Sequence, residues 1–161
     1  MGSSDVDKHT GSYHLCLHDA GIDNCNIIVY SSILPAISNK LEKPNSITHG
    51  EVAECIIAEV NGGVGEVISC GITFGMLYDK VTGVKYGGLV CERNGHYTEE
   101  KIKNQLGESL KELYTNGYSD KYDMKDVEVY TNTMHGKKLY NTAMVCLVFQ
   151  SYEIEIEKGD F

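Results

Sequence analysis

The stretch "NCNIIVYSSILPAI", residues 24–37, carries two adjacent serines, Ser31 and Ser32, inside an apolar run that leads to Pro35. Its β-branched and apolar residues predict a strand over residues 25–34. Strand interiors seldom carry a serine pair for packing reasons. The pair therefore has two interpretations, a strand end with two spare hydroxyls or a reactive serine.

A reactive serine in this setting has a defined chemistry. A serine hydroxyl attacks the carbonyl of the preceding residue in an effectively unimolecular step, because the closure forms a small ring. The resulting ester is uphill unless the backbone is strained or the oxyanion is stabilised. β-Elimination from that ester breaks the chain and leaves dehydroalanine, which hydrolyses to a pyruvoyl group and ammonia. Such a fixed ketone forms a Schiff base with an amine and accepts the electrons left when carbon dioxide departs.

Composition restricts the class of protein. The chain has 161 residues, 42% of them hydrophobic, which predicts one globular domain over residues 1–161. Its formal net charge of −9 argues against nucleic-acid binding, for which basic patches supply most of the affinity. No apolar run is long enough to span a membrane, and the N-terminus has no signal-peptide pattern, so we expect a cytoplasmic protein.

The six cysteines are scattered without a C-x-x-C motif, which favours free thiols over disulfides or a zinc site. His14 and His18 are four residues apart and could share a metal ion on a helix, but spacing suggests no third ligand. We therefore expect no metal. "NGGVGE", residues 61–66, is favoured as a turn rather than a phosphate loop.

Two helices are predicted. Residues 11–23 form the first, with Ser12 as a possible N-cap and Gly21 at its end. Residues 98–117 form the second and clearer one, capped by Thr98. Its expected apolar stripe consists of Ile102, Leu106, Leu110, Leu113 and Tyr114.

The remaining periodic segments predict strands. Residues 66–79 and 84–92 form a hairpin, and residues 127–133 and 138–156 form two further strands. Residues 51–60 fit helical spacing and strand alternation about equally well. Helices separated by runs of strands indicate an α+β layered fold.

Glu92 is the last residue of an apolar strand, where a carboxylate is usually solvated but can act as a general acid if the strand end opens into a pocket. A serine hydrolase is disfavoured because the sequence has no G-x-S-x-G elbow. The serine pair alone does not decide between these interpretations.

The motifs around the serine pair decide between these interpretations. "DAGIDNCNIIVYSSILPA", residues 19–36, resembles the self-cleavage segment of pyruvoyl-dependent arginine decarboxylases. "YGGLVCERNG", residues 86–95, is similar to the second motif of that family, a Gly-Leu strand that ends in the catalytic glutamate. Gly2-Ser3-Ser4 also falls where the family has Gly-Ser-Ser, so the resemblance covers essentially the whole chain.

The resemblance implies self-cleavage between Ser31 and Ser32, into a β chain of residues 1–31 and an α chain of residues 32–161. Ser32 would become a covalent pyruvoyl group, so that no dissociable cofactor is needed. Glu92 would donate the proton that follows decarboxylation, and Asn26 would assist processing and position the reacting groups.

The family fold implied is a four-layer αββα sandwich of the pyruvoyl-dependent histidine/arginine decarboxylase type, which also assigns residues 51–60 to a strand. The implied assembly is a trimer of αβ units, or a dimer of trimers, with active sites between neighbouring subunits. The implied reaction is L-arginine to agmatine and carbon dioxide, and Leu17 and Ile33 would contact the substrate.

One departure concerns the substrate. The family's substrate-binding aspartate aligns with His14, and a neutral imidazole offers guanidinium one acceptor and no charge. We therefore expect Asp23, which stands where some family members have glycine, to supply the missing carboxylate. An Asp in a helix-to-strand turn is at least as good an explanation of that residue.

Two alternatives stay open from the sequence. The first is a pyruvoyl decarboxylase of another amino acid, such as histidine, because His14 changes the pocket. The second is an oligomeric scaffold homologue that never processes itself. The presence of Ser32, Asn26 and Glu92 together favours the enzyme.

Overall fold

The computed structural model describes residues 1–6, 9–41 and 46–150. Its elements are β1 (Gly2–Val6), α1 (His9–Ala20), β2 (Asn26–Val29), β3 (Ile33–Pro35), β4 (Val52–Gly62), β5 (Val67–Asp79), β6 (Lys85–Gly95), α2 (Glu99–Gly117), β7 (Tyr122–His135) and β8 (Tyr140–Phe149). Within these described ranges, two helices and two sheets make an α+β fold, as the sequence predicted.

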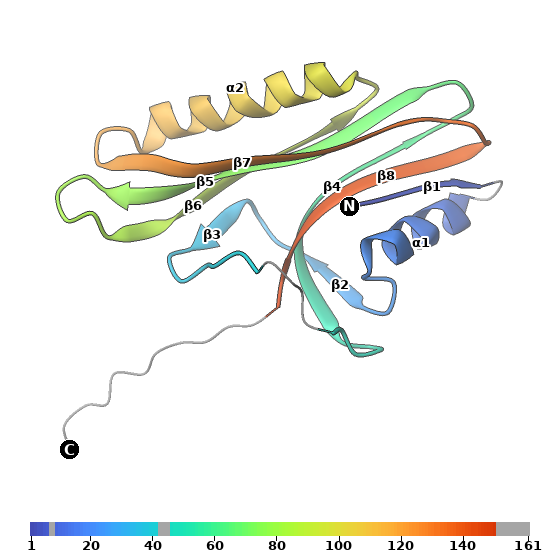
Figure 1. Ribbon diagram of the computed structural model, residues 1–161, viewed down its shortest axis with the longest axis horizontal. Helices are drawn as coiled ribbons and strands as arrows, with labels where there is room; N and C mark the ends of the chain where they lie inside the picture. Colours follow the sequence, from blue (N-terminus) through green and yellow to red (C-terminus); the bar gives the residue numbers. More distant parts are fainter. Residues whose placement is uncertain (7–8, 42–45, 151–161) are drawn as a thin grey trace.

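The strands form two four-stranded sheets (Figure 1). Sheet A has the order β1-β8-β4-β2, and sheet B has the order β3-β6-β5-β7. Neighbours are antiparallel except β2 and β4, which run parallel. Helix α1 contacts β1 and β8 of sheet A, and α2 contacts all three long strands of sheet B.

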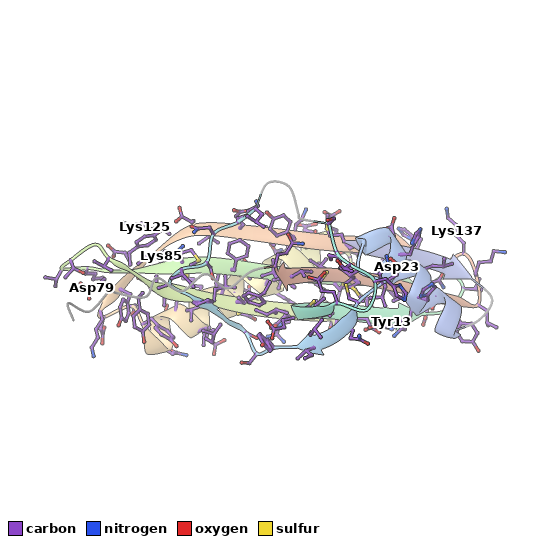
Figure 2. The ribbon with its side chains drawn as sticks, turned by 90° about the horizontal axis from the view of Figure 1, so that it is seen from below. Tyr13, Asp23, Asp79, Lys85, Lys125 and Lys137 are labelled. Atoms are coloured by element: carbon purple, nitrogen blue, oxygen red, sulfur yellow. The ribbon has the colours of Figure 1, made fainter. Side chains whose placement is uncertain are left out.

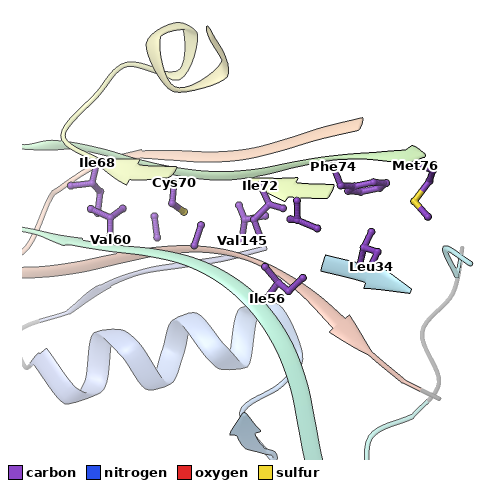
Figure 3. Close-up of a cluster of buried hydrophobic side chains, with 12 residues drawn as sticks. Leu34, Ile56, Val60, Ile68, Cys70, Ile72, Phe74, Met76 and Val145 are labelled. Atoms are coloured by element: carbon purple, nitrogen blue, oxygen red, sulfur yellow. The ribbon is translucent and has the colours of Figure 1, made fainter. Parts of the chain in front are cut away.

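The two sheets face each other across the main hydrophobic core (Figure 3). Side chains alternate across a strand, so β4 directs Ile56, Ala58 and Val60 into this core, while Ile57 on its other face packs against the cluster under α1. The opposing side chains come chiefly from β5, which is buried along most of its length. The core members are Leu34, Ile56, Ala58, Val60, Ile68, Cys70, Ile72, Phe74, Met76, Val90, Ala143 and Val145.

Helix α2 begins where the sequence predicted. The Thr98 side chain accepts a hydrogen bond from the Lys101 N–H and caps the helix. Ile102, Leu106 and Leu110 are buried against sheet B. Tyr114, four residues after Leu110, continues the stripe and is partly buried, whereas Leu113 lies off this row and is 40% exposed, contrary to its expected place.

Helix α1 starts earlier than expected, at His9, so Ser12 lies inside the helix and is not its N-cap. The Ser12 hydroxyl is buried and hydrogen-bonded to Thr142 Oγ1 of β8 at 2.8 Å. Gly21 does end the helix, with φ of 76°. Its N–H bonds the His18 carbonyl and the Ile22 N–H bonds the Leu17 carbonyl, the Schellman pattern that favours glycine.

The strand β1 was not predicted, and β7 begins at Tyr122, five residues before its predicted start at residue 127. Two further strand predictions need correction. Residues 25–34 are not one strand, since β2 belongs to sheet A and β3 to sheet B. The strand β6 continues to Gly95, three residues beyond its predicted end at Glu92. The ambiguous residues 51–60 are a strand, β4. The predicted strand 138–156 is confirmed as β8 up to Phe149, and its residues after Gln150 lie outside the described part of the chain.

The six cysteines are free, as predicted. Across the residues that the structure describes, no helix is long and apolar enough to cross a membrane.

Candidate active site at the junction of the two sheets

The chain passes from sheet A to sheet B through Tyr30, Ser31 and Ser32. The Tyr30 N–H donates to the carbonyl of Cys55 on β4 at 2.8 Å, which extends the β2–β4 pairing by one bond. Two residues later the Ser32 carbonyl accepts from the Val90 N–H on β6 at 3.1 Å. The serine pair is therefore held from both sides, by one sheet before it and by the other sheet after it.

Glu92 faces this crossing. Side chains alternate along β6, so Glu92 lies on the same face as Val90, whose side chain enters the core between the sheets. The Ser32 hydroxyl donates to the Glu92 carboxylate and lies 2.8 Å from both Oε1 and Oε2. Both residues are half-buried. The structure thus brings together the two residues that the sequence singled out for cofactor formation and proton donation.

Tyr30 adds an anchor immediately before the serine pair. Its hydroxyl donates to Glu54 Oε1 on β4, and its ring lies 5.8 Å from the ring of Phe149 on β8, measured between centroids. Sequence reasoning missed Tyr30 and Glu54. The position of Tyr30 beside Ser31 was the one available signal, because the distant Glu54 carries no motif.

Asn26 is the first residue of β2, paired with Val52. Its side-chain N–H donates to the carbonyl of Gly50 at 2.9 Å. Gly50 has a φ of 84°, a conformation that favours glycine. The Asn26 amide thus secures the turn that leads into β4, and it lies one short strand away from the serine pair.

The predicted substrate contacts of α1 form a second group. Leu17 is buried between α1 and sheet A, whereas His14 is exposed. Asp23 lies just beyond the helix (Figure 2) and accepts a hydrogen bond from His18 Nδ1 at 3.1 Å. That hydrogen bond is the main reason that the pKa of Asp23 is lowered, and the nearby charge of His14 adds to it. Asp23 therefore stays a carboxylate at neutral pH.

Within one chain, these residues fall into two places. Ile33, 55% exposed, follows Ser32 at the start of β3, where it is paired with Leu89 of β6. Leu17 belongs to α1, which packs against the face of sheet A that points away from the main core. In the part of the chain that the structure describes, no three His, Cys, Asp or Glu residues lie close enough to hold a metal ion.

A half-buried serine hydroxyl held against a carboxylate, at the crossing between the sheets of an α+β fold, is an arrangement suited to acid–base chemistry at one backbone position. The family described as pyruvoyl-dependent arginine decarboxylase matches residues 1–154 of the chain. The chain therefore belongs to the pyruvoyl-dependent arginine decarboxylase family, a family of decarboxylases.

A curated relative agrees with this assignment. The chain is 28% identical over 145 residues to pyruvoyl-dependent arginine decarboxylase 2 of Archaeoglobus fulgidus. The match covers 86% of this chain and 85% of the relative.

Proposed function

We propose that the chain cleaves itself between Ser31 and Ser32 and then decarboxylates L-arginine to agmatine and carbon dioxide. The observation that carries this proposal is the hydrogen bond from the Ser32 hydroxyl to the Glu92 carboxylate. It joins the residue from which a pyruvoyl group is made to a residue that can move a proton at the same position. Family membership supports the covalent pyruvoyl group in general.

The residues around Ser32 fit such a group. Its hydroxyl is half-buried and faces Glu92, while its carbonyl is bonded to β6. After cleavage, residue 32 would be the first residue of the α chain and β3 would follow directly. Because Ile33–Pro35 pair with β6, the new chain end stays attached to sheet B beside Glu92.

A pyruvoyl group supplies a ketone that binds an amine substrate covalently and accepts the electrons released with carbon dioxide. The side chains around residue 32 supply the proton and restrict the access of water. Glu92 presents a carboxyl group within hydrogen-bond reach of residue 32 and would deliver the proton that replaces carbon dioxide. The closed packing of Val90 and its core neighbours beside Glu92 limits the access of water from that side.

The substrate assignment depends on a carboxylate for the guanidinium group. Asp23 is ionised at neutral pH because the hydrogen bond from His18 lowers its pKa. His14, at the position of the family's aspartate, is exposed beside it. The alternative substrate is another amino acid such as histidine, which the same His14 observation favours, because an imidazole there removes the expected partner of arginine.

The assembly we propose is a trimer of αβ units, or a dimer of trimers, each unit being a four-layer αββα sandwich of the histidine/arginine decarboxylase type. Two observations support it. The predicted site residues lie in two groups within one chain, so a neighbouring subunit can bring Asp23 to Ser32. In addition, Val29 and Ile33, on either side of the serine pair, are 65% and 55% exposed, which suits an interface.

Intact mass under denaturing conditions tests the proposal. We expect two fragments, residues 1–31 and residues 32–161, the larger one with a ketone-reactive, blocked N-terminus. Ser32→Ala should abolish cleavage, whereas Ser46→Ala, at an exposed serine outside the site, should not. A single uncleaved chain in freshly folded protein would overturn the proposal and leave a non-processing scaffold. Carbon dioxide release from arginine, ornithine, lysine, histidine and aspartate then identifies the substrate.

A further inference from the structure

We propose that the backbone N–H of Ile33 is the oxyanion donor for the first step of self-cleavage. The inference rests on the proposed function and assigns a role to a main-chain group. The Ile33 N–H donates a hydrogen bond to the carbonyl oxygen of Ser31 at 2.9 Å. This carbonyl is the one that the Ser32 hydroxyl attacks, so its oxygen is the atom on which negative charge develops.

The hydrogen bond has the geometry of an oxyanion contact. A bond from residue 33 to residue 31 closes a γ-turn around Ser32. In the described part of the chain, Asp126 is the only residue other than glycine with a positive φ, so Ser32 has a negative φ and the turn is the common inverse form. The donor lies 2.9 Å from the carbonyl oxygen before the attack, so it is within hydrogen-bond reach when negative charge develops on that oxygen.

The Ile33 N–H can bond the Ser31 carbonyl because it donates no hydrogen bond to β6 within sheet B. Extending the β3–β6 register by one residue places Ser32 opposite Val90, and the Val90 N–H donates to the Ser32 carbonyl, as in a hydrogen-bonded pair. Hydrogen-bonded and non-hydrogen-bonded pairs alternate along an antiparallel ladder. The next pair, Ile33 with Leu89, is therefore of the non-hydrogen-bonded kind, and the Ile33 N–H points away from β6.

The step balances with the groups already present. The bond between Ser32 Oγ and the Ser31 carbonyl carbon forms, and the bond from that carbon to the Ser32 nitrogen then breaks. The Glu92 carboxylate orients the hydroxyl through its hydrogen bond, and the hydroxyl proton ends on the departing Ser32 nitrogen. Between these events the Ser31 oxygen carries the negative charge, facing the Ile33 N–H. No electron is lost and no co-reactant is consumed.

A backbone ester removes this one donor. In cell-free translation of the full chain, a suppressor tRNA charged with the α-hydroxy acid analogue of isoleucine replaces the Ile33 amide with an ester and keeps the side chain. The matched control places the same ester at Ile37, an exposed residue in the loop after β3. Intact mass at successive times gives the rate of cleavage between Ser31 and Ser32, and protease resistance of the precursor reports its folding.

We expect wild type and the Ile37 ester to cleave at the same rate, and the Ile33 ester to cleave about 100-fold more slowly or worse while its precursor stays protease-resistant. Ile33→Ala, which keeps the N–H, should cleave much faster than the Ile33 ester. Equal rates for the two esters would overturn the inference and leave the proposed function standing. Loss of protease resistance in the Ile33 ester, or Ile33→Ala as slow as that ester, would also overturn it. An uncleaved wild-type chain would instead overturn the proposed function itself.

Discussion

The Ser32 hydroxyl and the Glu92 carboxylate lie 2.8 Å apart although 60 residues separate them in the chain. They meet because Ser32 follows the crossing from sheet A to sheet B, while Glu92 lies on the inward face of β6, the strand that β3 joins. This contact places one carboxylate where it can serve both the formation of a pyruvoyl group and its later use.

Glu92→Gln separates these two uses. Gln keeps an acceptor oxygen for the Ser32 hydroxyl but has no proton to deliver. We expect the variant to remain cleaved and to lose about 100-fold or more in carbon dioxide release, the usual contribution of a general acid. Intact mass and carbon dioxide release from the same preparation are the two measurements. Full activity of the cleaved variant would remove Glu92 from the role of proton donor.

Asp23→Asn tests the carboxylate that we assign to the substrate. Loss of a hydrogen bond to a charged group weakens binding by about 1.5–3 kcal/mol, so the KM for arginine should rise about tenfold or more. Asp19→Asn removes the same charge from neighbouring α1 and serves as the control. His14→Asp, which restores the family's aspartate, should lower the KM for arginine. An unchanged KM in Asp23→Asn would show that the guanidinium group binds elsewhere.

Gly71 on β5 allows α2 to pack closely on sheet B. A Cβ there would lie 2.7 Å from the Tyr130 carbonyl oxygen and 2.8 Å from Leu106 Cδ1 of α2. Gly71→Ala should therefore destabilise the fold by about 1–3 kcal/mol, the usual effect of overpacking. Gly107, inside α2, has open space around its Cα, so Gly107→Ala should stabilise by about 0.5–1 kcal/mol. Urea denaturation of both variants gives the free energies, and equal values would refute the close packing.

The buried thiols predict a loss of stability at alkaline pH. Burial raises the pKa of Cys16, Cys55 and Cys70 to about 12. An unfolded thiol ionises near pH 8.5, so the unfolded chain releases protons that the folded chain retains. This contribution to stability is complete below about pH 8.5 and is lost as the pH rises towards 12.

Cys55→Ala isolates the effect of one thiol. Between pH 8 and pH 10.5, the urea midpoint should fall less in this variant than in wild type, because one group with a raised pKa is gone. Because the other titrating groups are the same in both proteins, their contribution cancels when the change of the urea midpoint with pH is compared between variant and wild type. Parallel slopes for the two proteins would show that the Cys55 thiol ionises as readily in the folded state as in the unfolded one.

Several features could be predicted because they depend on local sequence. Thr98 capped α2 as expected, and Gly21 ended α1, since each acts through hydrogen bonds to residues a few positions away. Ser12 shows the opposite case. It resembles an N-cap in sequence, yet tertiary packing buries it in α1 against Thr142, a partner 130 residues away.

The candidate site also has features that could be predicted from the sequence and features that could not. The resemblance of two local motifs to a known family singled out Ser32, Glu92 and Asn26. The break between β2 and β3 was not visible, since the apolar run through residues 25–34 reads equally well as one continuous strand. Which sheet receives each half depends on pairing with β4 and β6, and these strands lie far along the chain.

The order of the residues thus specified the chemistry available at the serine pair, because a hydroxyl next to a peptide carbonyl is a covalent property of the chain. The folded structure alone decided how that chemistry is arranged. It placed Glu92 against the Ser32 hydroxyl and the Ile33 N–H against the Ser31 carbonyl. Both contacts arise because the chain changes sheets at residues 30–32, and that change results from long-range strand pairing that no local pattern records.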